Sequence, residues 1–307
     1  MSEGYRALKE SAAWFRIPGR GRICATGADR ARLLHAMCTN HVQQLTPGEG
    51  CYAFFLNPQG RIQADSHILC FEDHLLVDTE PETRERLFAH LDRYIIADDV
   101  TIEDRGDSIS TLALEGPKSA EVLERLGAQA PEKPYGWTPW GERWTAQLDA
   151  TGGPGFWILA APEDLEKLGA SLDLPEASAD DIRTVRVENG KPRFGEDIFE
   201  TVIPHETRQL HAVHFNKGCY LGQEIVERVR SRGRVNRELW RLLIAGQAVP
   251  ERRTRVLAGG KEAGEITTAV FSPAHSAVLA FAYLRVELLR PNAEFEVNGA
   301  AARIFGQ

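Results

Sequence analysis

The C-terminal part of the chain has a residue pattern that limits it to an all-β module. From Leu239 onward, short apolar segments alternate with Gly, Pro and Asn; they read LWRLLIAG, TRVLAGG, GEITTAVF, AVLAFAYL and FEVNGAAARIF. Segments this short, bounded by turn-forming residues, are typical of strands and shorter than most helices. Successive antiparallel strands close readily into a barrel, because closure removes unpaired sheet edges. The sequence therefore predicts a small antiparallel β-barrel over residues 239–307.

The preceding part of the chain mixes strand and helix signals. Strand-like segments alternate with helical stripes over residues 20–115, and a stretch rich in Pro, Gly and Trp follows over residues 128–155. These patterns predict an α+β fold with a first module over residues 1–127 and a second over residues 128–238. The order strand, glycine, helix occurs at Gly27 and again at Gly116, which suggests two related units.

Charge and cysteine content limit the compartment and the partners. The formal net charge of −8 disfavours nonspecific nucleic-acid binding by the whole surface. The five cysteines form an odd set without a C-x-x-C pair, which argues for a reducing compartment. No apolar run approaches the roughly 20 residues that cross a bilayer, and the N-terminus has no secretory h-region. We expect a cytoplasmic protein without a membrane partner.

The segment from Lys217 to Glu238 has the opposite charge balance, with six bases and three acids. It places Cys219 in a turn before a helix that we expect from about Gln223 to a stop at Gly233. A helix N-terminus and nearby cations both favour the thiolate form of a cysteine. The functional interpretation is a reactive or ligating Cys219 beside anion-binding arginines. The alternative is a buried cysteine next to a solvated basic helix.

This segment resembles the signature of the YgfZ family, folate-binding proteins of iron–sulfur cluster maintenance that are related to the glycine-cleavage T-protein. The matching residues are Lys217, Gly218, Cys219, Tyr220, Gly222, Gln223 and Glu224, then Arg228, Arg232, Gly233 and Arg237. The resemblance implies a T-protein-like fold, with antiparallel sheets and helices around a central cavity and a C-terminal barrel. It also implies tetrahydrofolate as the ligand and Cys219 as the working group, with Lys217 keeping the thiol ionised.

Two further stretches resemble the T-protein superfamily. Residues 50–62 followed by Asp65 look like the stretch that carries its pterin-proximal aspartate, and residues 186–198 look like the segment whose glutamate, here Glu188, holds the pterin ring. A carboxylate can accept paired N–H bonds from a pterin edge, and a second one near the reacting nitrogens can steer a proton. By resemblance, the predicted catalytic residues are Cys219, Lys217 and Asp65. The predicted folate-binding residues are Glu188, Asp65, Arg186, Tyr52, Tyr220 and Arg228.

Taken alone, Asp65 would be an ordinary solvated strand residue and Glu188 an ordinary surface residue. T-proteins usually have two adjacent aspartates at the Asp65 position, whereas this chain has Ala64 before Asp65, and they lack the Lys-Gly-Cys-Tyr segment. Both differences favour the YgfZ-like branch.

We therefore predict a tetrahydrofolate-binding factor that uses Cys219 to assemble or repair iron–sulfur clusters in client enzymes, including tRNA-modifying ones. One alternative is a folate-dependent aminomethyltransferase of the T-protein type, which takes an aminomethyl group from a lipoyl carrier. Another is a noncatalytic RNA- or protein-binding scaffold that uses residues 228–237, although few aromatic side chains are available there for stacking.

Metal and nucleotide sites have little support in the sequence. His205, His211, His214 and Cys219 lie close together in the sequence, but their spacing matches no standard zinc pattern, and we predict no metal. Phosphate-loop and dinucleotide-binding glycine motifs do not occur. We expect folate and iron–sulfur client proteins as partners, and no direct nucleic-acid binding.

Overall fold

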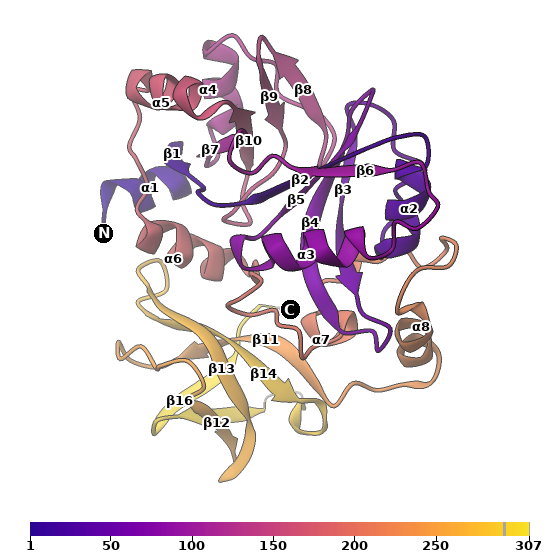
Figure 1. The fold of residues 1–307 in the computed structure, drawn as a ribbon. Helices are drawn as coiled ribbons and strands as arrows, with labels where there is room; N and C mark the ends of the chain where they lie inside the picture. The colour runs from indigo at the N-terminus through magenta and orange to yellow at the C-terminus, as the bar shows by residue number, and fades with distance from the viewer. Residues whose placement is uncertain (291–292, 307) are drawn as a thin grey trace.

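The computed structural model describes residues 1–290 and 293–306, except for the side chain of Arg232. Its first sheet has five antiparallel strands in the order β3, β4, β5, β2, β6 (Figure 1). Their bounds are β2 Gly21–Thr26, β3 Gly50–Leu56, β4 Ile62–Cys70, β5 Leu75–Thr79 and β6 Thr101–Asp104. The β3–β4 turn is stabilised by the Asn57 side chain, which accepts hydrogen bonds from the backbone N–H groups of Gln59 and Arg61 at 3.0 and 2.9 Å.

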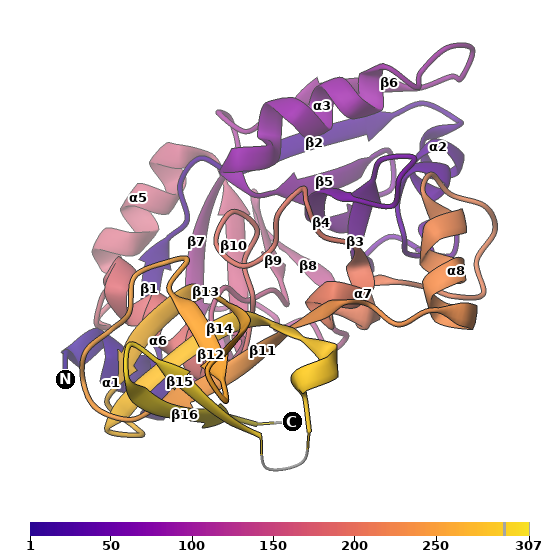
Figure 2. The same cartoon turned by 90° about the horizontal axis from the view of Figure 1, so that it is seen from below.

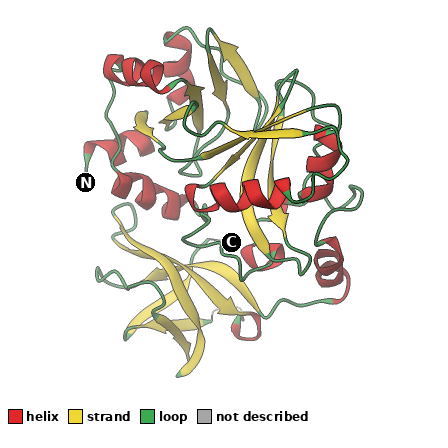
Figure 3. Cartoon of the chain, viewed as in Figure 1, coloured by secondary structure: helices red, strands yellow, loops and turns green. Residues whose placement is uncertain are grey.

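The two faces of the first sheet have different neighbours. One face is covered by α2 (Arg30–Met37) and α3 (Arg84–Asp92), which follows the 3₁₀ turn η1 (Pro81–Thr83) (Figure 3). Within β4, Ala64 and Ile68 belong to this helix-covered core, whereas Leu69 packs with the second sheet. Because side chains alternate along a strand, Asp65 and His67 share the face of Leu69, which is the face toward the second sheet.

The second sheet is also antiparallel, in the order β1, β7, β10, β9, β8. Its strands are β1 Ala13–Arg16, β7 Ser110–Glu115, β8 Trp137–Trp140, β9 Arg143–Ala146 and β10 Gly155–Ala160. One face packs on the first sheet through a core that includes Trp157 and Leu69. The other face is covered by α4 (Ser119–Arg125) and α5 (Pro162–Ser171). The pair therefore forms a four-layer arrangement with helices outside.

The C-terminal module is a closed barrel in the order β11, β14, β13, β12, β15, β16 (Figure 2). Its strands are β11 Arg237–Ile244, β12 Arg255–Ala258, β13 Lys261–Ser272, β14 Ala277–Arg285, β15 Glu294–Val297 and β16 Ala300–Ile304, with η3 (Val286–Leu288) between β14 and β15. Helix α6 (Ala179–Asn189) contacts both β13 and α1 (Glu3–Glu10), and so connects the barrel to the rest of the chain. The remaining elements are α7 (Pro204–Thr207), η2 (Leu210–Ala212) and α8 (Gln223–Arg232).

The predicted fold class is confirmed, with antiparallel sheets, covering helices and a C-terminal barrel. The predicted helix after Cys219 is α8, which ends before Gly233 as expected. Both expected strand–glycine–helix units are present: β2 leads through Gly27 to α2, and β7 leads through Gly116 to α4. The module boundary at residue 127 stays a prediction; strands β7 and β10, on either side of it, pair in one sheet. Among the described residues, no helix has the length and apolar character to cross a bilayer.

Candidate functional site

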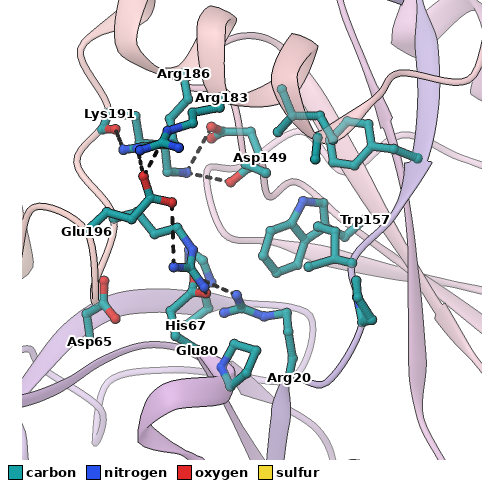
Figure 4. Close-up of a pocket in the computed structure, with 18 of the residues that line it drawn as sticks. Arg20, Asp65, His67, Glu80, Asp149, Trp157, Arg183, Arg186, Lys191 and Glu196 are labelled. Carbon is teal, nitrogen blue, oxygen red and sulfur yellow. Dashed lines mark hydrogen bonds and ion pairs between the residues drawn. The ribbon is translucent and has the colours of Figure 1, made fainter. Parts of the chain in front are cut away.

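A cavity of about 500 Å³ lies where the two sheets meet helix α6 and the segment that follows it (Figure 4). Strands β3, β4 and β10 supply Tyr52, Asp65, His67 and Trp157. The rest of the wall comes from the end of β1, from loops and from α6, and its charged members are Arg16, Arg20, Glu80, Asp149, Asp180, Arg183, Arg186, Lys191, Arg193 and Glu196. This is the central cavity that the resemblance led us to expect, and its volume is in the range of small-molecule sites.

Asp65 is a cavity carboxyl with a buried oxygen that has no partner among the described residues. The Tyr52 hydroxyl donates a hydrogen bond of 2.7 Å to Asp65 Oδ2, while Oδ1 is buried without a hydrogen-bond partner among the described residues. Burial, reinforced by the nearby Glu80 carboxylate, raises the pKa of Asp65 to about 6. A carboxyl with this pKa can hold or release a proton close to neutral pH, which suits a general acid or base.

His67 is a cavity residue that we did not predict. Its imidazole is buried, and Nδ1 lies 3.7 Å from Asp78 Oδ1 on the neighbouring strand β5. Burial lowers the pKa of His67, which favours the neutral ring. The two-residue period of β4 after Asp65 was the available sequence signal, since it places both side chains on one face.

Most charged side chains of the cavity wall form ion pairs with one another or with their neighbours. Arg20 donates to Asp78 and Glu80, with 2.6 Å to each. Arg193 pairs with Glu80 at 2.9 Å and with Glu82 at 2.8 Å. Such networks satisfy buried charges and hold the wall in one arrangement.

Other charged side chains of the wall are also paired. Lys191 pairs with Asp149 at 2.8 Å. Arg186, a predicted folate ligand, lines the cavity, but its guanidinium is bound by Asp197 at 2.7 Å and Glu196 at 2.9 Å. Because these contacts occupy its donors, we infer that Arg186 mainly shapes the cavity.

Glu188 does not line the cavity. Its Oε1 accepts hydrogen bonds from the Tyr5 hydroxyl at 2.8 Å and from Ser272 Oγ at 2.6 Å, and its Oε2 pairs with Lys9 at 3.0 Å. These contacts join α6 to α1 and to barrel strand β13. The geometry therefore gives the predicted pterin-anchor role of Glu188 no support and indicates a structural one.

The Cys219 segment lies apart from the cavity, because none of Cys219, Lys217, Tyr220 and Arg228 lines it. Cys219 is exposed while the other four cysteines of the chain are buried, so the alternative of a buried Cys219 is wrong. Arg228 is exposed on α8 and pairs with Glu224 at 2.7 Å. Tyr220 is buried in an apolar core, and Lys217 Nζ lies 5.0 Å from the centre of its ring. The structure thus separates residues that the sequence led us to group in one site.

The contacts of Lys217 do not support its expected role of keeping the Cys219 thiol ionised. Its ammonium is buried and donates hydrogen bonds to three backbone carbonyls, those of His35, Cys38 and Asn40, the last two at 2.7 and 2.8 Å. Its partners are thus carbonyl groups at and just beyond the C-terminus of α2, where a cation is favourable. Lys217 therefore stabilises the end of this helix.

The histidines that could have held zinc do not converge. His211 stacks on Tyr52, His205 lies near Phe215, and His214 contacts His41 edge to face. Within the described ranges, no group of three or more His, Cys, Asp or Glu side chains is arranged to hold a metal ion.

Comparison with known proteins identifies relatives over the whole chain. A family model described as "GCVT N-terminal domain" matches residues 1–147, and one described as "Glycine cleavage T-protein C-terminal barrel domain" matches residues 237–304. An aminomethyltransferase from Aquifex aeolicus is 24% identical over 99% of this chain and 84% of its own length. One from a Nostoc species is 26% identical over 97% of this chain and 83% of its own length. The crystal structure of aminomethyltransferase T from Bartonella henselae has a TM-score of 0.89 at 19% identity, covers 99% of this chain and 87% of that one, and so supports the fold.

Proposed function

We propose that this chain, a relative of the glycine-cleavage T-proteins that carries their N-terminal and C-terminal barrel domains, binds tetrahydrofolate in the cavity around Asp65 and uses it in one-carbon transfer of the aminomethyltransferase type. Relatives named aminomethyltransferase, aligned over nearly the whole chain, support this choice over the iron–sulfur function that we expected from Cys219. The residue Ala64, where T-proteins usually have a second aspartate, remains a difference from that family.

The observation that carries this proposal is the free oxygen of Asp65. A buried carboxylate oxygen without a partner is costly unless a ligand supplies a donor or a positive charge. The second oxygen is fixed by the Tyr52 hydroxyl at 2.7 Å, so the carboxyl presents Oδ1 in a defined direction. The cavity volume of about 500 Å³ and the aromatic rings of Tyr52 and Trp157 also suit a flat heterocyclic ligand.

The cavity residues have different roles in the proposed reaction. Bound tetrahydrofolate supplies nucleophilic nitrogens that carry a one-carbon unit. Asp65, with its pKa raised to about 6 by burial and by Glu80, can accept a proton or stabilise positive charge next to such nitrogens. The ion-paired wall that includes Arg20 and Arg193 holds the cavity in one arrangement.

The proposal is tested by tetrahydrofolate titration of the wild type, Asp65→Asn and Tyr52→Phe, with Asp173→Asn, an exposed aspartate outside the cavity, as the matched control. We expect binding by the wild type and the control, and a loss of about tenfold or more in Asp65→Asn, the order of one hydrogen bond to a charged group. Aminomethyl transfer from a lipoyl carrier protein should fall with it. Absence of tetrahydrofolate binding in the wild type would refute the proposal.

A second candidate function is the iron–sulfur factor, and the exposure of Cys219 favours it. This thiol is the accessible one of the five, and a side chain at the neighbouring Gly218 would begin 3.8 Å from His35 Nε2, so an imidazole lies beside this segment. An exposed thiol can meet a client protein, whereas the buried thiols cannot. The test is complementation of an iron–sulfur enzyme defect by Cys219→Ser compared with Asp65→Asn. Failure of Cys219→Ser with normal aminomethyl transfer would support this function, and full complementation would exclude a working thiol.

A further inference from the structure

The cavity has few hydrogen-bond acceptors that remain open to a ligand. The carboxylates of Glu80, Asp149 and Glu196 are paired with cations of the wall, and Asp180 is exposed at its rim. The proposed function assigns the free oxygen of Asp65 to the reacting nitrogens. A folate also carries N–H donors on its pyrimidine ring, which need an acceptor when they are buried. Among the described side chains that line the interior, Ser66 and His67 remain without a paired acceptor. By strand alternation Ser66 is on the opposite face of β4 from Asp65, whereas His67 shares the face of Asp65.

The surroundings of His67 determine which of its nitrogens faces the ligand. Nδ1 is buried and lies 3.7 Å from the carboxylate oxygen Oδ1 of Asp78. Because His67 lines the cavity and its Nδ1 side is turned to Asp78, we infer that Nε2 is the nitrogen that faces the ligand. Although burial opposes it, the neighbouring guanidinium groups of Arg20 and Arg22 hold the pKa of Asp78 well below its usual range. A permanent negative charge beside Nδ1 favours the tautomer with the proton on that nitrogen. Nε2 then carries a lone pair directed toward the cavity.

The imidazole is also held in place by aromatic rings from three segments. It packs edge to face on Trp157 at 5.3 Å between ring centres, and tilted against Tyr52 at 5.4 Å and Tyr135 at 5.9 Å. A ring packed on several sides has little freedom to rotate, so a ligand need not restrict it further. His67 is therefore a pre-oriented acceptor two residues from Asp65 on the same strand face.

We propose that His67 determines ligand specificity in this cavity, and that its Nε2 accepts a hydrogen bond from the 2-amino group of a folate pyrimidine ring. This inference rests on the proposed function and assigns to His67 the recognition that the sequence led us to expect from Glu188. Unlike His67, Glu188 has no acceptor available to a ligand, because Tyr5, Ser272 and Lys9 already bind its carboxylate.

The test compares two ligands on three proteins by equilibrium titration. The ligands are tetrahydrofolate and its 2-desamino-2-methyl analogue, which lacks the amino donor. The proteins are the wild type, His67→Phe, which keeps an aromatic ring but removes the acceptor, and His90→Phe as the matched control. His90 is a half-buried histidine of α3 that packs on Tyr94 at 5.5 Å and lies outside the cavity.

We expect the wild type and His90→Phe to bind the analogue about tenfold more weakly than tetrahydrofolate, the order of one buried hydrogen bond. His67→Phe should bind tetrahydrofolate about tenfold more weakly and no longer distinguish the two ligands. Equal affinity of the wild type for both ligands overturns the inference without any variant, so it remains testable even if His67→Phe fails to fold. Undiminished discrimination by a folded His67→Phe also overturns it. Wild type that binds neither ligand refutes the proposed function and the inference with it.

Discussion

Replacing Lys217 by methionine tests whether its ammonium group has a structural or a catalytic role. The buried Nζ donates to the carbonyls of His35, Cys38 and Asn40, and the neighbouring Leu221 N–H donates to the carbonyl of Ala36 at 2.9 Å. The segment 217–221 thus satisfies groups that the last turn of α2 cannot satisfy within the helix. Methionine has a similar length and is apolar, so Lys217→Met removes the donors and leaves the volume nearly filled.

The magnitude follows from the three acceptors. A buried carbonyl that loses its partner costs about 1–3 kcal/mol. Burial lowers the pKa of Lys217, which means that burying the ammonium offsets part of what its hydrogen bonds contribute. We therefore expect the free energy of unfolding to fall by about 3 kcal/mol, below the sum of three separate losses. With a urea dependence of about 3 kcal/mol per molar, the midpoint should move down by about 1 M.

The assay is urea unfolding followed by tryptophan fluorescence, together with the reaction rate of Cys219 with a disulfide reagent under native conditions. Lys133→Met is the matched control, because Lys133 is 72% exposed in its pair with Glu49, and its midpoint should not change. We expect the thiol rate of Lys217→Met to stay within about twofold of wild type, since Lys217 is directed at carbonyl groups. An unchanged midpoint with a rate at least tenfold lower would refute the structural role and restore Lys217 as the group that activates the thiol.

Two further predictions concern the acidic residues. Glu188→Gln should lower the free energy of unfolding by about 1–2 kcal/mol, because its amide cannot replace both the pair with Lys9 and the acceptor for Tyr5 and Ser272. Its tetrahydrofolate affinity should stay within about twofold of wild type. A loss of affinity without a loss of stability would return Glu188 to the pterin site. Because the folded-state pKa of Asp65 is raised to about 6, its carboxylate should be lost as the pH falls through 6, and tetrahydrofolate affinity should fall with it; the same inflection in Asp65→Asn would contradict this assignment.

Several features of the site could be read from local sequence. Tyr52 and Asp65 were both identified, and the β3–β4 hairpin brings the phenol to 2.7 Å from the carboxylate. The hairpin turn itself follows from Asn57, whose side chain binds the backbone within a few residues. His67 was missed because a histidine in an apolar strand has no local signal for what lies opposite its ring.

The sequence by itself determined where helices and strands begin and end, and which face of a strand a side chain occupies. Turn residues mark where the strands of the barrel end, the glycine at residue 233 marks the end of α8, and the two-residue period of β4 places Asp65 on one face; each depends on contacts within a few positions along the chain. Only the tertiary structure decided which groups contact the buried charged side chains. Lys217 meets carbonyls 177 to 182 positions away, and Glu188 meets Tyr5, 183 positions away. The reason is physical: the energy of a buried charge depends on every group that surrounds it, and those groups are brought together only when the sheets, helices and barrel pack.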